Sequence, residues 1–128
     1  MQRKTGMVKA VFDRKQHKIN IELNILSWED DGVFFQYSPA LDLVGYGSNE
    51  KEAGESFKAV LNEFVNYTDN KKTIYIELER LGWTVNKKKH RVTPPTSEQI
   101  FEDNETYRDL RNKPGVRIQQ TSVGLALA

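Results

Sequence analysis

The chain has 128 residues, 19 basic and 18 acidic side chains, and no cysteine. A domain of this size buries roughly two thirds of the surface of its unfolded chain, so it can fold as one unit without cross-links. The absence of cysteine excludes disulfides, thiolate zinc sites and cysteine nucleophiles. A net charge of +1 excludes a polycation that binds nucleic acid with its whole surface, so such binding requires a local patch or a dimer.

The chain contains no obvious membrane or export segment. No apolar run approaches the roughly 20 residues that a membrane span needs. Residues 1–9 lack the apolar middle of a secretory signal, and the apolar residues 123–128 are too few to span a bilayer. We therefore expect a soluble cytoplasmic protein that does not bind membranes.

The first half of the chain has the pattern of a three-stranded antiparallel meander. Residues 18–26 alternate apolar with polar side chains, which predicts a strand with one buried face. The turn at residues 29–32 contains an Asp-Gly pair that tolerates positive φ, and the aromatic residues 33–38 return as a second strand. Pro39 interrupts the pairing, and residues 41–47 form a third strand whose glycines allow close backbone approach.

An amphipathic helix is predicted after the meander. Asn49 can cap it, and Glu52 occupies the capping-box position. Apolar residues then recur at helical spacing up to about Tyr67 and predict a stripe that covers one face of the sheet. They are Ala53, Phe57, Val60, Leu61, Phe64 and Val65.

Residues 73–81 fit a helix or a strand, because Ile74 and Leu78 are compatible with both periods. We prefer a short helix, since Thr73 can cap it and Gly82 suits the position just past its end. A fourth strand is then predicted at residues 83–85, with residues 87–91 as its solvated continuation or as a turn.

Pro94 and Pro95 mark a boundary in the last third of the chain. Thr96 or Ser97 can cap one further helix, which ends at residues 112–115, and residues 116–127 predict an extended segment or a partly mobile tail. The apolar contacts of this helix are Ile100, Phe101, Tyr107 and Leu110.

The predicted fold class is therefore α+β, with a meander, an amphipathic helix, a fourth strand, and a C-terminal helix plus tail. Residues 1–17 are an N-terminal extension in which alternating Val8, Ala10 and Phe12 permit an extra strand. Residues 18–93 form the α+β domain. Residues 94–128 are expected to pack on or beside it.

The order of these motifs from residue 19 to about residue 85 resembles the HicB-like antitoxin family. The resemblance rests on the first strand, the Glu-Asp-Asp-Gly turn, the aromatic second strand with Ser-Pro-Ala-Leu after it, and three short motifs. Those motifs are Val-Gly-Tyr-Gly at 44–47, Asn-Glu-Lys-Glu-Ala at 49–53 and Leu-Gly-Trp at 81–83.

The resemblance implies a degenerate, partial ribonuclease-H-like fold and a protein-binding role. Family members neutralise HicA, a small ribonuclease toxin that binds double-stranded RNA, and many carry a helix-turn-helix or ribbon-helix-helix module for operator DNA. This chain has no obvious helix-turn-helix after Pro95. We therefore expect an antitoxin-type module, as a homodimer with a HicA-like partner; the alternatives are a nucleic-acid-binding transcriptional regulator and an orphan relative without a toxin.

The carboxylates do not form the pattern of a metal nuclease. Ribonuclease-H chemistry needs several acids converging on two divalent metals, but the polar face of the first strand offers only Glu22. Asp30 and Asp31 fit the geometry of the turn, and His17 and His90 stand alone. We expect no enzyme, no catalytic or metal site and no cofactor.

The sharpest candidate for a contact site is the basic cluster Lys87, Lys88, Lys89 and Arg91 near Trp83, which could meet phosphates or an acidic partner. The alternative, a solvated turn, is the commoner use of such runs.

A second candidate is a partner groove made by Trp28, Phe34 and Tyr46. The alternative is core packing, because aromatic residues on short strands are more often core or sheet cover.

Overall fold

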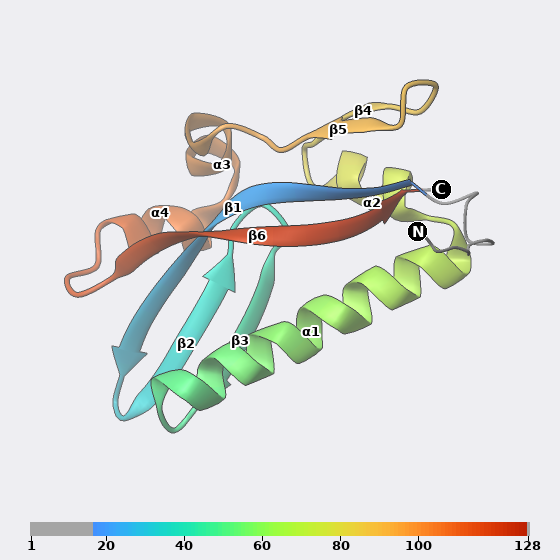
Figure 1. Ribbon diagram of the computed structural model, residues 1–128. Coiled ribbons are helices and arrows are strands. Elements are labelled where there is room, and N and C mark those ends of the chain that lie inside the picture. Colours follow the sequence, from blue (N-terminus) through green and yellow to red (C-terminus); the bar gives the residue numbers. More distant parts are fainter. Residues whose placement is uncertain (1–16, 128) are drawn as a thin grey trace.

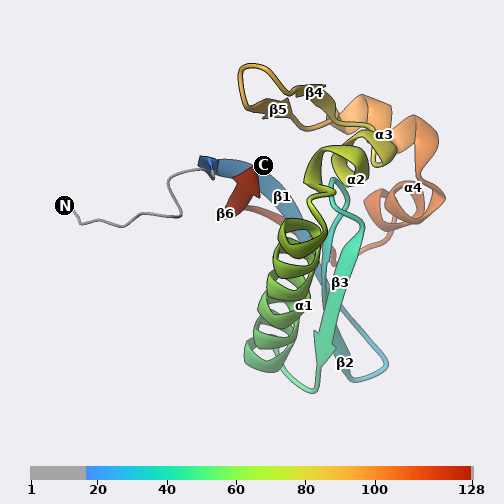
Figure 2. The ribbon, with the colours of Figure 1, turned by 90° about the vertical axis from the view of Figure 1, so that its right-hand side faces the viewer.

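The computed structural model describes residues 17–127, in which a four-stranded antiparallel sheet carries helices on both faces (Figures 1 and 2). The strands lie in the order β3-β2-β1-β6. They are β1 (His17–Asp30), β2 (Val33–Ser38), β3 (Leu43–Gly47) and β6 (Arg117–Leu127). The predicted α+β class and the meander followed by a helix are confirmed.

Strand β1 is longer than its alternating segment because its first part pairs with β6 and its last part pairs with β2. Its last part pairs with β2, with Leu26 opposite Tyr37 and Asp30 opposite Val33. Its other edge pairs with β6, with His17 opposite Leu127 and Ser27 opposite Arg117. The two-residue turn between β1 and β2 has positive φ at Asp31 (52°) and Gly32 (80°), as the Asp-Gly pair predicts. The sequence left two alternatives for the final segment, an extended segment or a mobile tail. The structure shows the first, because residues 117–127 form strand β6 of the main sheet.

Helix α1 (Glu50–Lys71) packs against one face of the sheet, and its backbone lies close to that of β3 (Figure 2). Asn49 Oδ1 accepts a hydrogen bond from Glu52 N at 2.9 Å, as the cap prediction required. The Glu52 carboxylate accepts from Ser48 N at 2.9 Å, one residue before the expected capping-box partner. A Cβ at Gly45 would lie 2.3 Å from Phe57 N, so the glycine is what lets the helix backbone approach the strand.

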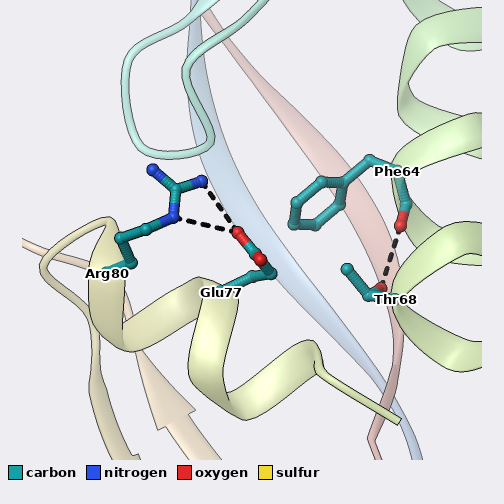
Figure 3. A network of polar contacts seen from close by, with 4 residues as sticks. All are labelled: Phe64, Thr68, Glu77 and Arg80. Carbon is teal, nitrogen blue, oxygen red and sulfur yellow. Dashed lines mark hydrogen bonds and ion pairs between the residues drawn. The ribbon is translucent and has the colours of Figure 1, made fainter. Parts of the chain in front are cut away.

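The prediction ended the helix at Tyr67, but the helix continues to Lys71. Thr68 can remain helical although its side chain is buried, because its hydroxyl has a hydrogen-bond partner. Its hydroxyl donates to Phe64 O at 2.9 Å within α1, so the buried oxygen is satisfied (Figure 3). The chain turns at Lys72, which has φ 56°. Polar residues after Tyr67 thus extend the helix by one turn.

The ambiguous segment forms helix α2 (Ile74–Arg80), as preferred. Thr73 precedes it, but its hydroxyl makes no hydrogen bond to the described residues, so the predicted side-chain cap is wrong. Gly82 (φ 93°) follows the helix, and Trp83 N donates to Leu78 O at 2.9 Å, which completes a Schellman-type end.

Strands β4 (Thr84–Asn86) and β5 (Arg91–Thr93) form a separate two-stranded hairpin. The fourth strand begins one residue later than predicted because Trp83 belongs to the core: it is buried, and its indole Nε1 donates to Ala40 O at 2.8 Å. Val85 and Val92 pair with each other and pack on the same core cluster. The hairpin base is therefore anchored to the protein body.

The single C-terminal helix of the prediction is two helices, α3 (Ser97–Asp103) and α4 (Glu105–Arg111). Asn104 leaves helical geometry (φ −127°, ψ 105°), and its side chain caps α4 by accepting from Tyr107 N at 2.9 Å. The predicted Thr96 cap is present as a full capping box with Gln99. Helix α4 covers the sheet face opposite α1 through Tyr107 and Leu110 (Figure 2).

The described part of the chain begins at His17 and ends at Leu127. The extra strand expected at Val8, Ala10 and Phe12 lies outside the described residues. Within residues 17–127, no helix is long and apolar enough to cross a membrane.

Two glycine-to-alanine changes test the packing of α1 on β3. Gly45→Ala places a methyl group against the helix backbone, and we expect a loss of about 3 kcal/mol in the free energy of unfolding. Gly54→Ala lies within α1, where the added Cβ meets Gln36 at an ordinary 3.6 Å, so helix propensity should stabilise the protein by about 0.5–1 kcal/mol. Urea unfolding measures both. Equal effects of the two changes would contradict the close approach.

Candidate functional site

A row of aromatic side chains crosses three strands on the sheet face opposite α1. Trp28 is paired with Phe35, and Phe35 with Tyr46, so the three residues point to the same side. The Trp28 and Phe35 rings stack with centroids 5.1 Å apart, and the Phe35 and Tyr46 centroids are 6.3 Å apart. We call Trp28, Phe35 and Tyr46 the aromatic row.

The aromatic row lies next to the helical cover and remains accessible at one end. Tyr107 and Leu110 of α4 bury Leu26 and Tyr37 on this face. Tyr46 is 64% exposed and its strand neighbour Val44, paired with Tyr37, is 46% exposed. An exposed tyrosine next to an exposed valine on a strand is an apolar surface at which a partner could bury area.

Of the three residues in the partner groove predicted from sequence, two belong to the aromatic row and one lies on the other face of the sheet. Trp28 and Tyr46 share the face, but Phe34 is paired with Gly47 and lies on the face that α1 covers. Sequence reasoning missed Phe35, although the period-two alternation of a strand separates neighbouring residues onto opposite faces. Applying that rule between Phe34 and Phe35 requires the register with β1, which the sequence did not specify.

A hydrogen-bonded network holds α4 beside the aromatic row. Tyr37 donates its phenol proton to Asp42 at 2.7 Å and accepts from Asn104 Nδ2 at 2.9 Å. Asn104 is the residue that separates α3 from α4, so one side chain both starts α4 and ties it to β2. Burial raises the pKa of Tyr37 to about 12; the Asn104 bond lowers it, and the Asp42 bond and charge raise it.

The predicted basic cluster lies at the tip of the β4–β5 hairpin. Lys87, Lys88, Lys89 and Arg91 are all exposed, and the tip extends away from the sheet in both ribbon views. The structure therefore brings the four predicted residues together. Trp83 is not beside them as an accessible ring, because it is buried in the core.

The backbone of the tip is organised by hydrogen bonds at its base. Lys89 N donates to Asn86 Oδ1 at 3.1 Å, and His90 adopts φ 52°. His90 is half-buried, with Nδ1 3.2 Å from the hydroxyl of Tyr75 on α2. His90 is thus part of the hairpin anchor.

Among the acids considered for nuclease chemistry, Glu22 is far from Asp30 and Asp31 at the turn. Glu22 and Asp30 are separated by eight positions along β1, about 27 Å at the rise of an extended strand. Asp30 lies at the turn, and its carboxylate is 3.9 Å from Lys113 Nζ. Across residues 17–127, no group of three or more histidine, aspartate or glutamate side chains is arranged to hold a metal ion.

An open groove of about 520 Å³ lies between the end of α2 and the α3–α4 junction. Asp42, Asp103 and Glu105 line it together with Arg80. The Arg80 guanidinium is held by Glu77 at 2.7 Å (Figure 3), so it is not an unpaired cation in the groove.

Comparison of the chain with protein-family models, with curated proteins and with solved structures finds no match.

The Tyr37 network predicts a specific loss of stability at high pH. The folded protein keeps the phenol proton up to about pH 12, whereas tyrosine in the unfolded chain ionises near pH 10. The stability that depends on this proton is therefore complete below about pH 10 and declines as pH rises towards 12. In urea unfolding, the advantage of the wild type over Tyr37→Phe should shrink by about 1 kcal/mol between pH 8 and pH 11. An unchanged advantage would contradict the network.

Proposed function

We propose that this protein is a binding module of the HicB-like antitoxin type, with no catalytic activity of its own, acting in the cytoplasm. The observation that carries the proposal is the aromatic row with exposed Tyr46 and Val44 beside it. The motif order of the first half supplies the class of partner: a small ribonuclease toxin of the HicA type, which the module would neutralise by covering part of its surface.

The physics of interfaces supports binding at the aromatic row. Tyrosine and tryptophan supply much of the energy in protein interfaces because they bury a large area while keeping a polar group for a hydrogen bond. The Trp28 and Phe35 rings stack on each other, and Tyr46 and Val44 lie on β3, which is paired with β2 from Leu43 to Gly47. Residues held on a paired strand lose less conformational freedom on binding than residues of an unpaired segment.

We also propose that the protein is a homodimer paired through β6, which is an edge strand of the sheet formed by residues 17–127. The opposite edge, β3, is blocked where Tyr46 N donates to Ser56 Oγ of α1 at 3.1 Å. Strand β6 is eleven residues long, contains no proline or lysine, and has Arg117 as its only charged residue. Edge strands usually carry proline or charged side chains, which prevent pairing with another strand. Because β6 carries only Arg117, two copies could pair antiparallel along β6 without a clash of like charges.

The first test compares matched variants on two surfaces. The double change Val44→Ser and Tyr46→Ser removes the exposed part of the proposed interface. The control, Tyr67→Ser and Ile76→Ser, removes side chains of similar exposure (60% and 58%) from α1 and α2. Each pair should change the free energy of unfolding by less than about 1 kcal/mol, because exposed side chains contribute little to the fold.

Binding is measured by calorimetry with the product of an adjacent toxin-like gene, and function by rescue of growth in its presence. The Val44/Tyr46 variant should bind about 30-fold more weakly, the effect of losing a central aromatic contact, and should fail to rescue growth. The control should behave as the wild type. A wild-type protein that neither binds nor rescues would refute the antitoxin proposal and favour an orphan relative.

The dimer is tested by adding edge lysines. Gln120→Lys with Ser122→Lys places like charges across a β6–β6 contact, while within the sheet of one copy position 122 pairs with Glu22, which tolerates the added cation. Asn62→Lys with Asn66→Lys adds the same charge on exposed positions of α1. Sedimentation should give a dimer mass for the wild type and the α1 variant, and a monomer mass for the edge variant. A monomeric wild type would overturn the proposal.

A further inference from the structure

We propose that the tip of the β4–β5 hairpin binds the phosphate backbone of duplex DNA, at a site separate from the aromatic row. Lys87, Lys88, Lys89 and Arg91 form this site, which we call the basic tip. The inference does not depend on the toxin partner. It rests on the charge, exposure and anchoring of the hairpin.

Within residues 17–127, the cations of the basic tip have no carboxylate partner. None of the four has a carboxylate within 4.0 Å in the part of the chain that the structure describes. Five other basic side chains do have such a partner: Lys51, Lys72, Arg80, Lys113 and Arg117. The charge of the tip is therefore available to an external anion.

The near-neutral net charge hides a segregation of charge. Of the 19 basic side chains of the chain, four lie on the basic tip, and residues 86–91 contain none of the 18 acidic side chains. The rest of the chain therefore has 15 basic against 18 acidic side chains. A polyanion is thus attracted to the tip more than to the rest of the chain, which orients its approach.

The hairpin presents this charge on a stable support. Val85 and Val92 pack on the core below the tip, and Asn86 fixes the turn through its bond to Lys89 N. His90 is held against Tyr75. The four cations therefore stand on an ordered turn, so binding need not fold it.

The shape of the tip favours duplex DNA over other polyanions. A two-stranded β-ribbon fits the major groove of B-form DNA, whereas the major groove of duplex RNA is too deep and narrow for protein side chains. An anionic membrane would be favoured by apolar side chains at the tip, but residues 86–91 contain none. The Asn86 side-chain oxygen is occupied by Lys89 N, so we expect contacts to phosphates without base recognition.

Four phosphate contacts give a measurable salt dependence. The logarithm of the association constant should fall with the logarithm of salt concentration with a slope contribution of about −3.6 from the tip. Between about 50 and 200 mM salt, this corresponds to roughly a 100-fold loss of affinity.

The experiment follows the fluorescence anisotropy of a labelled duplex during titration with the full chain. In the tip variant, Lys87, Lys88, Lys89 and Arg91 are changed to glutamine. In a charge-matched control, Lys18, Lys51, Lys58 and Lys71, all exposed and distant in sequence, are changed to glutamine. The Val44→Ser and Tyr46→Ser variant is the third protein, because it separates failure of this site from failure of the partner-binding proposal.

The tip variant should reduce the magnitude of the salt slope by about 3, while the control reduces it by less than about 1 and the Val44/Tyr46 variant leaves it unchanged. Thermal unfolding shows whether the tip variant remains folded. If the wild type does not bind at low salt, or if the tip variant and the control lose the same slope, the proposal is wrong. Tighter binding to phosphatidylserine vesicles than to the duplex at equal salt would also overturn it.

Discussion

The pairing of β1 with β6 from His17 to Ser27 and with β2 from Leu26 to Asp30 is the constraint on which the rest of the structure depends. A strand held by β2 and by β6 cannot slip by one residue without moving its apolar side chains to the wrong face. Leu23 then packs in the cluster that contains α2, while Leu26 packs against α4. Because both faces of one strand are used, the protein needs helices on both sides of the sheet.

The loop between β2 and β3 connects the two candidate surfaces to this frame. Ala40 O accepts the Trp83 indole proton, which fixes the chain that leads into the β4–β5 hairpin. Asp42 accepts the Tyr37 phenol proton, and Tyr37 accepts from Asn104 at the start of α4. One loop therefore positions the support of the basic tip and the helix beside the aromatic row. The two proposed binding surfaces lie on different elements, the aromatic row on β1, β2 and β3 and the basic tip on the β4–β5 hairpin.

Local chemistry made much of the fold predictable from sequence. The Asp31-Gly32 turn, the Asn49 and Thr96 caps and Gly82 after α2 each act within a few residues, and each occurs where expected. The predictions that were wrong share one physical cause, a side-chain hydrogen bond that the sequence pattern did not reveal. Thr68 remains helical because its hydroxyl bonds to a helix carbonyl, and Asn104 breaks a helix because it bonds across the molecule to Tyr37. Trp83 moves from the strand to the core through its bond to Ala40.

By itself, the sequence determined the class of fold, the meander with its following helix, and the four cations of the basic tip, because these depend on periodicity, turn chemistry and neighbouring residues. Only the tertiary structure decided that residues 117–127 pair with β1, that Phe35 rather than Phe34 joins Trp28 and Tyr46, and that the cations of the tip have no carboxylate partner among the described residues. Those facts depend on register and on contacts between residues far apart in the chain. The period-two pattern of a strand predicts which of its residues share a face, but the packing of the helices decides which face remains accessible to a partner.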